Sequence, residues 1–89
     1  MIPYPQLHDL AEYAAAGAAI DAVADSPSTG TPGSYIKIVS IAGGAVLEVI
    51  TAAGNTRALT VVANAEYRLD FTDITENTTC GPVQVGWSA

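Results

Sequence analysis

Short apolar segments separated by turn residues run through the chain after residue 33. Five of them are rich in the β-branched and aromatic residues that favour strands: 34–41, 45–51, 56–62, 66–74 and 81–87. Turn-forming residues interrupt them at Gly43-Gly44, Gly54-Asn55, 63–65 and 75–79. Strands at this spacing, with no helix between them, predict a mainly β protein. We expect a small antiparallel β-sandwich or barrel, jelly-roll-like, of about five to seven strands.

Two of these segments alternate between their faces with the period of a strand. In 45–51, one face carries Leu47, Val49 and Thr51. In 66–74, one face carries Tyr67, Leu69, Phe71 and Asp73. A hairpin that reverses near Gly54 is also expected to place Glu48 and Arg57 across from each other. The glycines at the two reversals supply the backbone freedom that tight turns require.

The first third of the chain has a different pattern. Apolar residues recur at a spacing of three or four from Leu7 to Val23, and seven alanines lie between Ala11 and Ala22. We therefore predict a short helix over 7–16 followed by extended chain. The alternative is an extended arm that lies on a neighbouring subunit, since Pro3 and Pro5 hold the first residues out of a helix.

A turn-rich stretch, 25–34, separates these two patterns. It contains two prolines, two glycines and five hydroxyl residues, a composition typical of a linker. The expected organisation is an N-terminal arm or short helix with its linker over 1–33, and a β-body over 34–89.

Composition adds an expectation about assembly. Only 13% of the 89 residues are charged and 49% are hydrophobic, whereas about 25% are charged in ordinary soluble domains. A domain of this size is often marginal alone and is commonly stabilised by disulfides, a metal or oligomerisation. One cysteine excludes an intrachain disulfide, and a single histidine far from it argues against a structural zinc site, so we predict a homo-oligomer.

Charge and hydropathy exclude some classes of binding partner and a location in a membrane. The net charge is −6 with three basic residues, which argues against direct binding to nucleic acid or to an anionic membrane. The start of the chain lacks a basic region followed by an apolar core, and no apolar run reaches 18 residues. We therefore expect a protein that is made and kept in the cytoplasm, with a free thiol and no membrane span.

No set of residues in the sequence predicts catalysis or a cofactor. His8 is expected to be exposed or capping, with a pH-sensitive contact as the alternative, and Cys80 to be a small buried residue. Three carboxylates, Asp70, Asp73 and Glu76, lie within seven residues and leave calcium binding open. We predict a protein that is not an enzyme and that has no catalytic, cofactor-binding or metal site.

Large side chains in the N-terminal segment are the candidate contacts with partners. That segment has little core of its own, so we assign an interface with partner chains to Tyr4, Leu7, Leu10 and Tyr13. Trp87 is added because tryptophan dominates the binding energy of many interfaces, although it can equally close the core of the β-body.

The β-body resembles small virion proteins of tailed phages, especially head spike-base proteins and capsid decoration (cement) proteins. "SIAGG" stands where that family tends to have "GTGG", and "VVANAEYRLDF" where it has a strand, a "PAG" turn and a strand. "NTTCGPVQVGW" corresponds to the family's terminal "GTTATxIVALW", and "AVADSPS" is similar to its "AVTPSD" lead-in. The likeness covers about residues 22–87, but the "PAG" turn lacks both proline and glycine here.

The resemblance implies a structural, non-enzymatic protein on the outer surface of a phage capsid. It would act by oligomerising, with a trimer as the favoured state, and by adhering to the major capsid protein, at a three-fold position, a vertex or a tail. The alternative from another class is a non-catalytic carbohydrate- or ligand-binding β-module. That function would need an exposed aromatic platform, for which Tyr35, Tyr67, Phe71 and Trp87 are the candidates.

Overall fold

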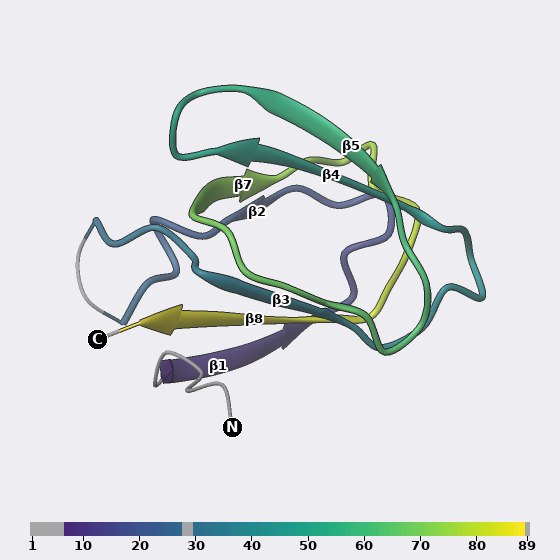
Figure 1. Cartoon of the computed structure of the whole chain (residues 1–89), viewed down its shortest axis with the longest axis horizontal. Coiled ribbons are helices and arrows are strands. Elements are labelled where there is room, and N and C mark those ends of the chain that lie inside the picture. The colour runs from purple at the N-terminus through teal and green to yellow at the C-terminus, as the bar shows by residue number, and fades with distance from the viewer. Residues whose placement is uncertain (1–6, 28–29, 89) are drawn as a thin grey trace.

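A computed structural model describes residues 7–27 and 30–88, and all of its regular structure is β (Figure 1). The strands are β1 (Leu7–Tyr13), β2 (Ile20–Asp21), β3 (Tyr35–Ile38), β4 (Val46–Thr51), β5 (Thr56–Thr60), β6 (Glu66–Tyr67), β7 (Phe71–Ile74) and β8 (Val83–Ser88). They form two four-stranded antiparallel sheets, in the orders β1-β8-β3-β6 and β2-β7-β4-β5. The predicted antiparallel β-sandwich is confirmed. There are eight strands because 66–74 splits into two and the N-terminal third adds two more.

The helix predicted over 7–16 is wrong, because residues 7–13 form strand β1. This strand pairs antiparallel with β8, and Leu10 lies opposite Gly86. The alanines gave the region a helical preference, but intrinsic propensity is a weak prior that tertiary pairing overrides. The segment is extended, as the arm interpretation required, but it lies on β8 of its own chain. A β-bulge at His8 interrupts the pairing.

The core lies between the two sheets and includes residues from the N-terminal third. Strand β8 contributes Val83, Val85 and Trp87, all at most 1% exposed, while Ile20 and Ala22 approach from the β2 region. The indole N–H of Trp87 donates to the carbonyl oxygen of Ala22 at 3.0 Å. The remaining buried apolar residues are Ala15, Ile36, Ile38, Leu47, Val49, Val61, Phe71, Ile74 and Cys80.

The hairpin between β4 and β5 reverses in the manner expected. The N–H of Thr51 donates to the carbonyl oxygen of Asn55 at 2.8 Å, and Gly54 has φ 88°. A positive φ after two turn residues is typical of three-residue hairpin loops, and glycine adopts it without strain. The register, however, pairs Glu48 with Ala58 and Arg57 with Val49, so the expected Glu48–Arg57 pair is not formed across the hairpin.

The segment 66–74 departs from strict alternation at β7. Its pairing with β4 shifts between Ile50 and Thr51, which leaves Thr72 as an extra residue in a bulge. Phe71 and Ile74 are therefore both buried, and Asp73 is partly exposed opposite Ile50. The expectation that Asp73 shares a face with Phe71 is wrong for this reason.

Glu48 fastens the loop 75–80 to strand β4. Its Oε1 accepts hydrogen bonds from Thr75 Oγ1 at 2.7 Å and from Asn77 Nδ2 at 3.0 Å. Its main chain is held by Thr78, whose Oγ1 accepts from the Glu48 N–H at 3.0 Å and donates to the Glu48 carbonyl at 3.3 Å. The hydrogen bonds that the Glu48 carboxylate accepts from Asn77 and Thr75 lower its pKa below the ordinary value of 4.5, because they stabilise the ionised form.

Replacing the tryptophan tests the centre of the core. Trp87→Ala is expected to lower the free energy of unfolding by about 3–5 kcal/mol, since it removes a buried ring and leaves a cavity. Trp87→Phe keeps most of the volume and should cost less. Urea denaturation followed by far-UV circular dichroism measures both. Equal, small effects would contradict the placement of the indole.

Acid titration tests the role of Glu48. Its pKa is lowered in the folded protein, so its contribution to stability is present above the unfolded value and is lost as pH falls below 4.5 through the folded value. We expect the denaturation midpoint of the wild type to fall more steeply over this range than that of Glu48→Gln. Parallel curves for the two proteins would contradict this.

Candidate interaction surface

The candidate interface residues lie in three different environments. Leu10 is on β1 and 48% of its side chain is exposed, whereas Trp87 is 1% exposed and belongs to the core. Tyr13 is half-buried at the end of β1. Tyr4 and the side chain of Leu7 lie outside the described residues. Of the two alternatives for Trp87, burial in the core holds, so its ring is not available for contact with a partner.

The outward face of the sheet β1-β8-β3-β6 carries Leu10. Residues directly opposite in an antiparallel pair share a face, so Leu10, Gly86 and Tyr35 form one row across three strands. Gly86 has no side chain and is itself buried, so the row presents the exposed Leu10 and the partly buried Tyr35. Val39 continues this face beyond β3, with 37% of its side chain exposed. We call Leu10, Gly86, Tyr35 and Val39 the outer strip.

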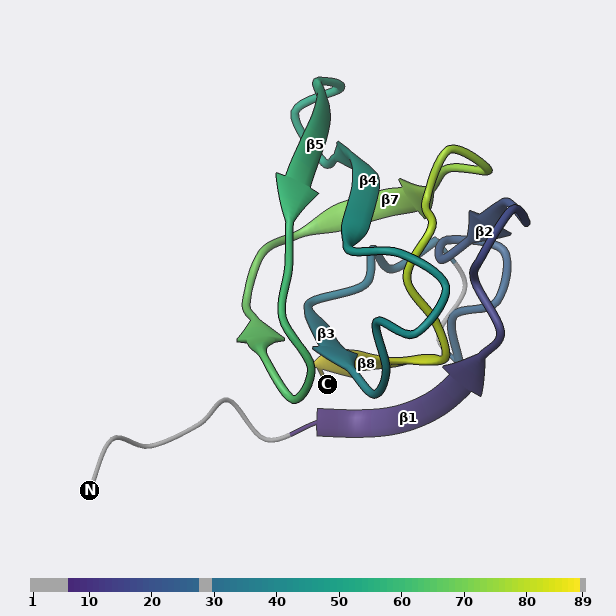
Figure 2. The same cartoon turned by 90° about the vertical axis from the view of Figure 1, so that its right-hand side faces the viewer.

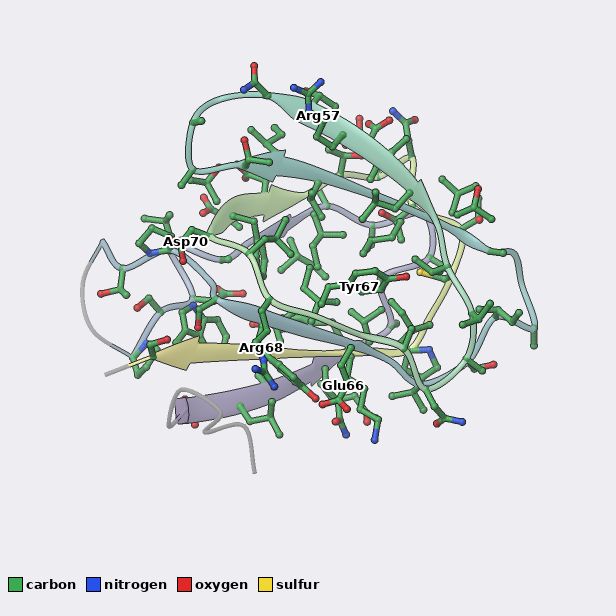
Figure 3. The ribbon with its side chains drawn as sticks, in the orientation of Figure 1. Arg57, Glu66, Tyr67, Arg68 and Asp70 are labelled. Carbon is green, nitrogen blue, oxygen red and sulfur yellow. The ribbon has the colours of Figure 1, made fainter. Side chains whose placement is uncertain are left out.

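A polar row crosses the outer strip between Tyr35 and Val39. Glu12, Gln84, Lys37 and Glu66 occupy successive strands at one level of the same face. Gln84 Nε2 donates to Glu12 Oε1 at 3.5 Å, and the Tyr35 hydroxyl donates to Glu66 Oε1 at 2.6 Å. The tyrosine is thus held along the sheet by a carboxylate from the polar row. Figure 3 shows Glu66 and Arg68 pointing outward beside β3 and β8, and Tyr67 pointing between the sheets.

Tyr13 joins β1 to the loop that follows β2. Its hydroxyl donates to Asp25 Oδ2 at 2.9 Å. Burial, the hydrogen bond to Asp25 and the negative charges of Asp25 and Asp9 raise the pKa of Tyr13 from 10.0 to about 12. The bond links the two sheets through their edge strands and holds the end of β1 in place.

The candidate chemical groups remain separate from one another. Cys80 is fully buried, and burial raises the pKa of its thiol, which agrees with the buried, unreactive role expected of it. Asp73 accepts a hydrogen bond from Thr72, while Asp70 and Glu76 are exposed on separate loops. Within residues 7–27 and 30–88, no three metal-ligating side chains come together. The side chain of His8 lies outside the described part.

The sequence did not reveal the outer strip, although one signal for it was present. In 83–88 the outward positions are Gln84, Gly86 and Ser88, and a glycine in that phase marks a flat place on the sheet. Recognising the strip also required the neighbours of β8, which the order of strands along the chain does not supply.

Comparisons with protein-family models, with curated protein sequences and with solved structures found no match for this chain. In the described ranges, the chain forms no helix with the length and apolar character needed to cross a bilayer.

The contact between Tyr13 and Asp25 gives an alkaline prediction. Because the pKa of Tyr13 is raised in the folded protein, its contribution to stability is present below pH 10 and is lost as pH rises toward 12. We therefore expect the stability of Tyr13→Phe to fall less between pH 10 and 12 than that of the wild type. Thermal denaturation of both proteins between pH 9 and 12 measures the difference. An unchanged slope would show that the hydrogen bond does not control it.

Proposed function

We propose that this protein is a structural virion protein that decorates and stabilises a phage capsid. In this role, as a decoration (cement) or head spike-base protein, it oligomerises and adheres to the major capsid protein on the outer surface. It has no catalytic role in this proposal. The proposal takes its starting point from the resemblance of residues 22–87 to such proteins.

The observation that carries the proposal is the outer strip. It lies on a sheet whose strands are supported by the core behind them, and it presents Leu10 and Val39 at 48% and 37% exposure. Exposed apolar side chains with polar side chains between them are typical of protein contact surfaces. Adhesion of this kind needs only modest affinity for each copy, because many linked copies bind one shell together.

The alternative, a carbohydrate- or ligand-binding module, has less support. Such modules bind sugars with exposed aromatic faces, yet Phe71 and Trp87 are buried and Tyr67 packs against the core. Tyr35 is partly buried with its hydroxyl bonded to Glu66. The described aromatic side chains therefore form no open platform.

Binding to capsid shells tests the proposal. Shells are assembled from the major capsid protein encoded in the same genome, mixed with purified protein and pelleted. We expect co-sedimentation, reduced by about tenfold in affinity by Val39→Asp, which places a charge at the strip. Val46→Asp is the matched control, because Val46 is also a valine with 37% exposure but lies on the other sheet.

Several results would contradict the proposal. It fails if the wild type stays in the supernatant, or if the genome encodes no major capsid protein. Equal binding by the two variants would exclude the outer strip as the adhesive surface. A glycan array then tests the alternative function, for which binding of the wild type to a defined sugar is the expected result.

A further inference from the structure

Within residues 7–27 and 30–88, the two sheets have two long free edges and two short ones. Strands β1 and β5 each end a sheet and have seven and five residues, whereas the edge strands β2 and β6 have two each. Proteins commonly shorten or cover their edge strands because a long edge pairs readily with another chain. Figures 1 and 2 both place β1 and β5 on opposite sides of the molecule, so they cannot pair within one chain.

The register shows which backbone groups of β1 point outward. Each residue of an antiparallel strand directs both its N–H and its C=O to the same neighbour, and successive residues alternate. The Val39 N–H donates to the carbonyl of Pro82, so 82, 84 and 86 turn toward β3 and 83, 85 and 87 toward β1. The partners of the latter are Tyr13, Ala11 and Asp9. Leu10 and Glu12 therefore direct their N–H and C=O groups to the free edge.

The same reasoning applies to β5. The Thr51 N–H donates to the carbonyl of Asn55, and the Val61 N–H donates to that of Ala45. Residues 57 and 59 consequently turn toward β4. The free edge of β5 then presents the N–H and C=O groups of Thr56, Ala58 and Thr60.

The charges on these edges are of opposite sign. Strand β1 carries Asp9 and Glu12, both exposed, and β5 carries Arg57 with no acidic residue. Among the described residues, the Arg57 side chain has no hydrogen-bond or ion-pair partner in its own chain. Pairing β1 with another β1 would bring four carboxylates together, and pairing β5 with β5 would bring two arginines together. Opposite charges across neighbouring strands are stabilising, and like charges are destabilising.

We propose that β1 of one copy pairs antiparallel with β5 of a second copy, so that the chain assembles head to tail. One register places Asp9 opposite Arg57 of the second copy and Leu10 opposite its Thr56, and both Leu10 and Thr56 have outward backbone groups. Repetition of this contact closes into a ring when the rotation between copies allows it. The inference rests on the self-association contained in the proposed function and specifies the surfaces that carry it.

Proline substitutions at the free edges test the pairing. Leu10→Pro and Ala58→Pro each remove an N–H that points away from the neighbouring strand, so the internal ladders keep their hydrogen bonds. By size-exclusion chromatography with light scattering, we expect the wild type to be oligomeric and each variant to be a monomer of 9.1 kDa. An equimolar mixture is expected to form a 1:1 heterodimer, because one intact β1 then meets one intact β5. Leu10→Val and Ala58→Val are the matched controls and should remain oligomeric.

Charge reversal supplies an independent test. We expect Asp9→Arg and Arg57→Glu each to raise the dissociation constant by about tenfold or more, and the double variant to restore it. Glu76→Arg makes the same change of charge as Asp9→Arg on a turn away from both edges and should have no effect. Circular dichroism and the fluorescence of Trp87 confirm that each variant is folded.

The outcomes separate this inference from the proposed function. Self-association that survives in Ala58→Pro or in Leu10→Pro would exclude β5 or β1, respectively, and failure of the charge rescue would exclude the Asp9–Arg57 register. A monomeric wild type would overturn the edge pairing, while binding of that monomer to capsid shells would still support decoration. An oligomer that fails to bind shells but responds to these variants would support the pairing and contradict decoration.

Discussion

The fold depends on the position of β8, which pairs with β1 on one side and with β3 on the other. Its inward side chains, Val83, Val85 and Trp87, are buried between the sheets. The last strand of the chain therefore holds the first one in place, and burial of apolar surface is the main term that stabilises the arrangement. Because these contacts join distant parts of the sequence, the N-terminal third cannot be separated from the core that it helps to form.

Polar contacts stabilise the places where the chain leaves the sheets. Glu48 binds the loop 75–80 through Thr75 and Asn77, and Tyr13 binds the loop after β2 through Asp25. Both contacts use a carboxylate that accepts from neutral donors, in a chain where cations are scarce. Such contacts preserve the geometry of loops and edges, whereas the core determines which strands meet.

The proposed assembly and the proposed adhesion use different parts of the same sheet. The outer strip lies on the flat side of β1-β8-β3-β6, while the free backbone groups lie along the edge of β1. In these two proposals the chain would bind copies of itself in the plane of the sheet and a shell through its face.

The β class, the turns at Gly43-Gly44 and Gly54-Asn55, and the alternation of 45–51 between two faces were predictable from the sequence, because strand period and turn chemistry are local properties. Residues 7–13 were not, since alanine-rich sequence favours a helix until a partner strand is present. Tertiary structure alone decided three features: the burial of Trp87, the bulge at Thr72 and the row of residues through Gly86. Each of them depends on which strands become neighbours, and local sequence does not encode that.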